Sequence, residues 1–223
     1  MPIFHKNKTI FVRIPKTAST SMHMALGRNA HDGMYHETIS SIKDRVNPSV
    51  FNGYFKFAFV RNPWDWALSW FYFKKTKIWK GESGPDFSTW IENIGKIAES
   101  RGGLYWFPGV EYSPLKKNLK SCGWSTCRAK IGYPCLCLMT NKQSDFICNS
   151  NGDIQLDFVG RFESLKEDWK HVVSKVKGPT PEGSLGHFVK TNHKSYREEY
   201  SKKAEAVVRS LYEDDIRLFD YDF

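Results

Sequence analysis

The sequence contains no long apolar run. None of its stretches reaches the roughly 18 consecutive apolar residues that a membrane-spanning helix needs. The first residues, M-P-I-F-H-K, also lack the apolar run of a secretory signal. We therefore expect a soluble chain without a membrane span, and we expect it in the cytoplasm.

Signatures of several other classes of protein are also missing. The pattern G-x-x-x-x-G-K-[ST] of a Walker A loop does not occur, and we find no internal repeat and no motif for binding nucleic acid. The five cysteines lie in one stretch, residues 122–148, and their C-x4-C-x7-C-x-C spacing is not that of a standard zinc finger. Free or structural thiols are the first expectation, with a local metal site or disulfides as alternatives.

The composition is that of a folded protein. Hydrophobic residues make up 40% of the 223 residues and aromatic residues 15%, which excludes disorder of the whole chain. At roughly 150 residues per domain, the length predicts a single domain over residues 1–223, with an irregular, substrate-facing insertion at about 74–149. The formal net charge of +9 favours an anionic partner, although a basic surface can also serve solubility alone.

The order of elements predicts an α/β fold. Apolar runs at 9–14 and 54–60 are typical of strands, and helices are expected at 22–26, at 37–46 and from Pro63 onward. This βαβ pattern predicts three layers, with a central, mainly parallel sheet flanked by helices. Later in the chain we expect a turn at 149–153, a strand at 154–159, a helix at 164–176 that opens with a Ser164–Glu167 capping box, and helices at 86–99 and 196–218.

The segment after the first strand has the residues of an anion-binding loop. Lys16 supplies a positive charge, and the backbone N–H groups at the start of the next helix favour a negative ligand. Hydroxyl groups follow at Thr17, Ser19, Thr20 and Ser21. The alternative is an ordinary helix capped by serine or threonine.

The second strand leads into a similar segment. Arg61 follows the strand at its carboxyl end, where open α/β sheets bind ligands, and Ser69 lies one to two helical turns further on. The pair could hold a second phosphate group, with arginine as a fork and serine as a donor. Alternatively, Arg61 is a structural ion-pair partner and Ser69 an ordinary residue of the helix.

Both segments resemble motifs of the sulfotransferases. Residues 11–21, F-V-R-I-P-K-T-A-S-T-S, are similar to the 5′-phosphosulfate loop of the carbohydrate sulfotransferases, including the heparan sulfate 2-O-sulfotransferase branch. Residues 57–69 resemble the 3′-phosphate motif F-V-R-N-P-x-x-R-x-x-S, and residues 160–165 resemble the segment G-R-F-E-x-L. Segments 196–200 and 214–221 resemble the family's ending. One departure is Trp66, where the family usually has arginine.

The resemblance implies a P-loop-like fold and transfer of a sulfuryl group from 3′-phosphoadenosine 5′-phosphosulfate (PAPS), which leaves 3′-phosphoadenosine 5′-phosphate (PAP). The transfer is in-line and needs no metal. Lys16 would act in catalysis at the leaving phosphate. The residues that the resemblance assigns to cofactor binding are Lys16, Thr17, Ala18, Ser19, Thr20, Ser21, Arg61, Ser69 and Arg161. Arg161 could instead form a brace with Glu163.

An acceptor hydroxyl needs a general base. His36 is the first candidate, because the family has a histidine at the same spacing before its 3′-phosphate motif. His31, Glu37 and His193 are weaker candidates, and His36 could simply be a surface or capping residue.

The acceptor is expected to be a glycan or a small metabolite with a hydroxyl or amine group, and no nucleic acid is expected as a partner. The Golgi lumen becomes the expected compartment if a membrane anchor lies outside this sequence. A P-loop-type small-molecule kinase and a non-catalytic polyanion-binding module are the alternative functions. The oligomeric state is left open.

Overall fold

The structure is a computed structural model that describes residues 3–27, 36–77, 85–100, 141–177, 185 and 195–223. The chain divides into two compact units. The first comprises residues 1–61 and 143–190, and the second comprises residues 62–142 and 191–223. The single domain over 1–223 stays a prediction. The same holds for the insertion, whose residues 101–140 lie outside the described part of the chain.

A four-stranded, mostly parallel sheet forms the centre of the first unit. The strands lie in the order β1-β2-β3-β4; β1 pairs antiparallel with β2, whereas β2, β3 and β4 are parallel. Their bounds are β1 Ile3–Phe4, β2 Thr9–Phe11, β3 Phe55–Val60 and β4 Phe158–Arg161. The predicted α/β class with a mainly parallel sheet is therefore confirmed.

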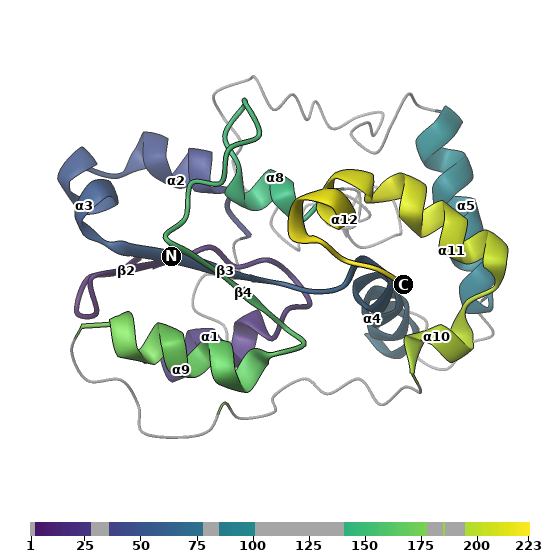
Figure 1. Ribbon diagram of the computed structural model, residues 1–223, viewed down its shortest axis with the longest axis horizontal. Helices are drawn as coiled ribbons and strands as arrows, with labels where there is room; N and C mark the ends of the chain where they lie inside the picture. Colours follow the sequence, from purple (N-terminus) through teal and green to yellow (C-terminus); the bar gives the residue numbers. More distant parts are fainter. Residues whose placement is uncertain (1–2, 28–35, 78–84, 101–140, 178–184, 186–194) are drawn as a thin grey trace. The chain divides into compact units, whose positions relative to one another are not determined.

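Helices cover both faces of this sheet (Figure 1). One face carries α1 (Ser19–Ala25) and α9 (Leu165–Lys175), and the other carries α2 (Ile39–Arg45), α3 (Pro48–Gly53) and α8 (Ser144–Ile147). The first unit thus has the three layers that the βαβ pattern predicts.

Alternation along β3 builds the core on the α1 and α9 side. Phe57 stacks on Phe11 of β2 with ring centroids 4.7 Å apart, and Phe59 and Trp169 pack against Phe57. Helices on both faces exclude water from the sheet. Burial of each aromatic side chain contributes about 1.5–3 kcal/mol to the free energy of folding. The centre of the sheet is therefore a rigid base for the loops that leave its carboxyl edge.

Gly160 in β4 lies where Phe59 fills the space that a side chain would occupy. A Cβ atom there would come within 2.6 Å of the Phe59 ring, whose residue is fully buried. We predict that Gly160→Ala lowers the free energy of unfolding by about 1–3 kcal/mol, measured by urea denaturation. Gly53→Ala is the matched control, because its added Cβ meets nothing within 4 Å. Equal stability of the two variants would contradict the prediction.

The second unit is helical in its described part. Its helices are α4 Pro63–Lys77, α5 Phe87–Ser100, α10 Tyr196–Glu199, α11 Lys202–Leu211 and α12 Glu213–Phe219. Trp64, Trp66 and Trp70 of α4 belong to its core. Trp66 lies edge-on to Tyr212 at 5.3 Å, so aromatic packing occupies the position where the family usually has arginine.

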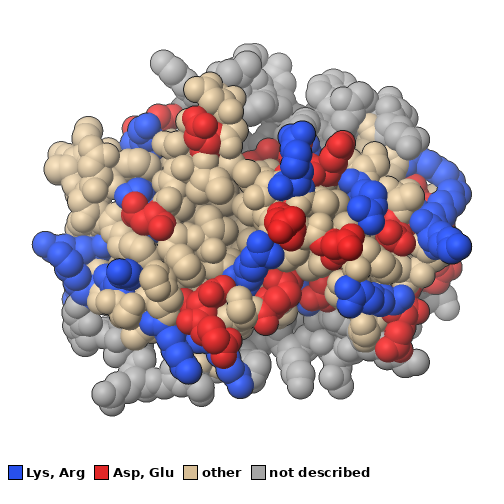
Figure 2. All heavy atoms as spheres, viewed as in Figure 1, with Lys and Arg blue, Asp and Glu red and all other residues tan. Residues whose placement is uncertain are grey.

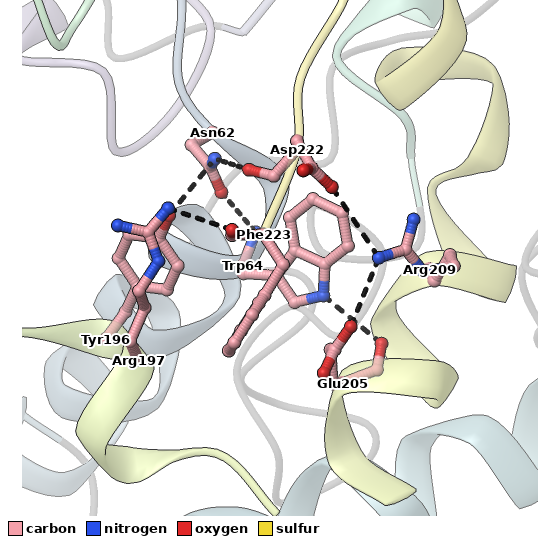
Figure 3. A network of polar contacts seen from close by, with 8 residues as sticks. All are labelled: Asn62, Trp64, Tyr196, Arg197, Glu205, Arg209, Asp222 and Phe223. Atoms are coloured by element: carbon pink, nitrogen blue, oxygen red, sulfur yellow. Dashed lines mark hydrogen bonds and ion pairs between the residues drawn. The ribbon is translucent and has the colours of Figure 1, made fainter. Parts of the chain in front are cut away.

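Asn62 is the first residue of the second unit. Its side chain caps α4 and bonds to the backbone near the C-terminus (Figure 3). Its Oδ1 accepts from the Trp64 N–H at 3.0 Å, and its Nδ2 donates to the Asp222 carbonyl at 2.8 Å. The Trp64 indole donates to the Glu205 carbonyl, and Arg209 lies 5.0 Å from a Trp64 ring centroid. The start of α4 is thus held by two hydrogen bonds, one to its backbone and one from the indole of its first tryptophan.

Two predicted element boundaries are wrong. Strand β4 begins at Phe158 rather than at 154, because Ile154 instead forms an isolated antiparallel bridge with Cys148 around the predicted turn at 149–153. The helix predicted over 196–218 is three helices. Ser201 caps α11 by accepting from the Ala204 N–H at 3.1 Å, which ends the preceding helix at Glu199.

The capping box predicted at the start of α9 is also wrong. The Ser164 side chain makes no capping hydrogen bond; its hydroxyl donates to the Asp168 carboxylate at 2.8 Å. The same carboxylate accepts from the Arg161 N–H at 2.6 Å. Asp168 therefore fixes the turn between β4 and α9 in place of the predicted Glu167.

No helix in the described segments is long and apolar enough to cross a membrane. Cys148 is the one cysteine within those segments.

Candidate functional site

The loop between β2 and α1 holds two residues in an unfavourable backbone conformation. Lys16 has φ +64° and Ala18 has φ +58°, both in the left-handed region that costs a residue with a side chain about 1–3 kcal/mol. Such strain persists where the surroundings enforce it, and it is concentrated at ligand-binding loops. The loop leads directly into α1 at Ser19, whose first N–H groups have no acceptor within the helix.

The hydroxyl groups of this loop differ in what they can offer a ligand. The Thr17 hydroxyl donates to the Ile14 carbonyl at 2.9 Å and closes the loop on itself. Thr17 could therefore hold an anion through its backbone N–H rather than its hydroxyl. Ser19 and Ser21 are buried, and Ala18 and Thr20 are half-buried.

Arg61 reaches this loop from the carboxyl end of β3. Its guanidinium donates to the Lys16 carbonyl at 3.1 Å and lies 4.1 Å from the centroid of the Phe162 ring. Phe162 follows β4 and donates its N–H to the Val60 carbonyl at 2.7 Å, so the stacking ring is anchored to the sheet. The structure thereby places the two predicted cationic residues, Lys16 and Arg61, next to each other.

His36 lies against the same segment. Its Nδ1 is 2.7 Å from the Arg13 carbonyl oxygen, which can only accept, so Nδ1 carries the proton and Nε2 carries the lone pair. Burial lowers the pKa of His36 to about 4; the hydrogen bond to the Arg13 carbonyl opposes this shift and the Arg13 charge adds to it. The imidazole is therefore neutral at pH 7 and has the tautomer that a base acting through Nε2 needs.

Burial and a neighbouring cation both disfavour the charged form of Lys16. Burial lowers the pKa of Lys16 to about 8, and the charge of Arg61 adds to the shift. Burial also lowers the pKa of Arg13. Like charges held together in partial burial favour an anion that would neutralise them.

The remaining predicted residues belong to several different elements. Ser69 is buried on α4 of the second unit, whereas Lys16, His36 and Arg61 belong to the first. Glu37 forms an ion pair with Arg45 at 2.6 Å, so its carboxylate is engaged away from His36. Arg161 ends β4, opposite Val60 of β3. His31 and His193 lie outside the described residues.

Sequence reasoning missed three residues that shape this site: Arg13, Gln143 and Phe162. Gln143 and Phe162 contact Arg61 across 82 and 101 positions of sequence, so no local pattern could have shown either contact. Phe162 belongs to the segment G-R-F-E that resembles the family, but the sequence pattern assigns it no role. Arg13 precedes the loop and has no distinguishing spacing.

The face in Figure 2 shows basic and acidic side chains interspersed, without a broad patch of one sign. Within the described segments, no group of three or more His, Cys, Asp or Glu side chains is arranged to hold a metal ion. Lys16 and Arg61 bring two positive charges together locally, where the Arg61 guanidinium donates to the Lys16 carbonyl.

Comparison with known proteins gives one match. The family model described as "Sulfotransferase family" matches residues 1–222. No curated protein and no solved structure matches the chain. The family match includes both loops of the site and nearly the whole of each unit, and the chain belongs to the sulfotransferase family.

Proposed function

We propose that the chain transfers a sulfuryl group from PAPS to a hydroxyl or amine group of an acceptor, either a glycan or a small metabolite. The observation that carries this proposal is the meeting of Lys16, Arg61 and His36 on the segment 13–17, in a chain that belongs to the sulfotransferase family. Two cations and a neutral base are the groups that this reaction requires.

The residues present fit an anionic nucleotide. Lys16 would hold the 5′-phosphosulfate together with the N–H groups of residues 17–21. Arg61 would hold the 3′-phosphate. When bound, PAPS supplies the activated sulfuryl group. Lys16 Nζ is a point charge that could neutralise the oxygen left on the 5′-phosphate when its bond to sulfur breaks.

His36 would act as the general base. Its Nε2 would accept the proton of the acceptor hydroxyl as the acceptor oxygen bonds to sulfur, which yields PAP and a sulfate ester. The bond from Nδ1–H to the Arg13 carbonyl keeps the ring in the required tautomer. In this proposal, the protein groups named here carry out the transfer and no metal ion takes part.

Titration with PAP, ATP and AMP tests the proposal. We expect PAP to bind much more tightly than AMP, and we expect Lys16→Ala and Arg61→Ala each to weaken PAP binding by about ten- to a hundredfold. Magnesium-dependent binding and turnover of ATP would instead support a kinase. A folded chain that binds none of the three nucleotides would leave the polyanion-binding module.

The pH dependence of kcat/KM follows from the two shifted groups. His36 must be neutral, so activity should fall as the pH drops through about 4. Lys16 must be charged, so activity should also fall as the pH rises through about 8. We therefore predict a bell-shaped profile with limbs near these two values.

One variant assigns the alkaline limb of this profile, and the position of the acid limb tests the environment of His36. Lys16→Arg should remove the alkaline limb, because arginine keeps its charge over this range. An acid limb near pH 6.5, the ordinary value for histidine, would contradict the environment described for His36. Circular dichroism at each pH separates loss of activity from unfolding.

A further inference from the structure

We infer that Gln143 is a positioning residue for Arg61, and that through Arg61 it sets the preference of the site for a nucleotide with a 3′-phosphate. This inference rests on the proposed function, because it assigns to Arg61 the 3′-phosphate of PAPS. Gln143 holds the backbone of Arg61 at the point where β3 ends.

The Gln143 side chain makes two reciprocal hydrogen bonds with the Arg61 backbone. Its Oε1 accepts from the Arg61 N–H at 2.8 Å, and its Nε2 donates to the Arg61 carbonyl at 2.7 Å. A carboxamide here reproduces the paired bonds that two residues exchange in an antiparallel ladder. Gln143 therefore extends the sheet pairing by one position beyond Val60, the last residue of β3.

Both partners are buried, so the geometry is closely fixed. Gln143 is fully buried and Arg61 is 5% exposed. Loss of either bond would remove a partner from a buried polar group, which is costly because water is excluded there. The Arg61 backbone consequently has little freedom to rotate, and its side chain leaves the sheet in one direction.

The contacts of the Arg61 guanidinium depend on the direction in which its side chain leaves the sheet. The guanidinium donates to the Lys16 carbonyl and stacks on Phe162, so it is held on one edge and one face. A planar guanidinium binds a phosphate well only when its fork is correctly aimed. Small rotations at the Arg61 backbone would move the fork off both contacts, and Gln143 opposes such rotations.

Gln143 also marks where the chain returns to the first unit. It is the first residue of that unit's second segment, and Arg61 is the last residue of its first segment. The two hydrogen bonds thus join the segments of the unit at the position of the site. The preceding residue, Lys142, forms an ion pair with Asp214 in the second unit.

The test compares PAP with AMP in a double-mutant cycle. Gln143→Met keeps the length of the side chain and removes both bonds. We expect Gln143→Met to lower the preference for PAP over AMP by about tenfold, with AMP affinity within about twofold of the wild type. In the Arg61→Ala background the same substitution should leave the preference unchanged, because Gln143 acts through Arg61.

Two further variants keep the test decisive. Thr9→Val is the matched control: it removes one buried hydrogen bond, from Thr9 Oγ1 to the Asn7 carbonyl, on β2 of the same unit, and it should leave the preference unchanged. Gln143→Glu retains the acceptor for the Arg61 N–H and loses the donor, so it should give an intermediate preference. If Gln143→Met does not fold, Gln143→Glu takes its place in the cycle.

The outcomes separate the inference from the proposed function. A folded Gln143→Met or Gln143→Glu protein that keeps the wild-type preference would overturn the inference. An effect of equal size with and without Arg61 would overturn it as well, because Gln143 would then act by another route. A wild-type protein that does not distinguish PAP from AMP would overturn the proposed function itself.

Discussion

Lys16→Ala is expected to lower kcat by about 10²–10³-fold, the cost of removing one preorganised group that stabilises developing charge. Lys16 lies in a left-handed backbone position beside Arg61, and burial already lowers the pKa of its ammonium to about 8. A bound anion would stabilise that charge. Steady-state kinetics with PAPS, together with PAP titration, measure the loss in catalysis and in binding separately.

Lys8→Ala is the matched control for Lys16→Ala. Lys8 is an exposed lysine of the same unit with φ +47°, so its substitution changes the same side chain in a similar backbone conformation. Activity of Lys8→Ala should equal that of the wild type. Lys16→Arg should recover part of the lost rate, since it restores charge without the compact ammonium. A Lys16→Ala enzyme with at least half of the wild-type kcat would rule out the proposed role.

His36→Asn is expected to lower kcat by about 10²–10⁴-fold, the usual contribution of a general base. The asparagine amide can still donate to the Arg13 carbonyl from nearly the position of the imidazole Nδ1, whereas the lone pair of Nε2 is lost. Structure and PAP affinity should therefore be retained while the chemical step slows. Single-turnover kinetics measure that step directly.

His5→Asn provides the comparison for His36→Asn. His5 lies in the first unit and also bonds through Nδ1, to the Tyr54 hydroxyl at 2.8 Å, but it is exposed and follows β1. Its substitution should leave kcat unchanged. Full activity of His36→Asn would move the base to another group, with His31, Glu37 and His193 as the remaining candidates. Glu37 would first have to leave Arg45.

Elements with strong local signals could be predicted from the sequence. The continuous apolar run before Arg61 predicts β3, and Pro63 at the first helical position predicts the start of α4. Strand β1 could not be predicted, because two residues have no periodicity and Ile3–Phe4 is a strand only through its pairing with β2. Helix α3 was missed although Asn47 caps it and Pro48 begins it, a signal obscured by its short length.

The same limit applies to the residues of the site: those with a local sequence signal could be predicted, and those placed by long-range contacts could not. Lys16 and Arg61 could be proposed because each stands in a short motif after a predicted strand, and His36 because of its spacing before the second motif. Gln143 could not be proposed, since it lies 82 positions from Arg61 and its role depends on how the chain returns to the sheet. The left-handed conformation of Ala18 was likewise hidden, because alanine carries no preference for it.

The tryptophans are divided very unevenly between the two units. Trp169 on α9 is the one tryptophan in the sequence of the first unit, whereas the other seven of the eight fall within residues 62–142 of the second. Intrinsic fluorescence therefore reports almost entirely on the second unit, while far-ultraviolet circular dichroism reports on helices in both. Denaturation curves from these two probes will coincide if the units unfold as one cooperative body and will separate if each melts independently.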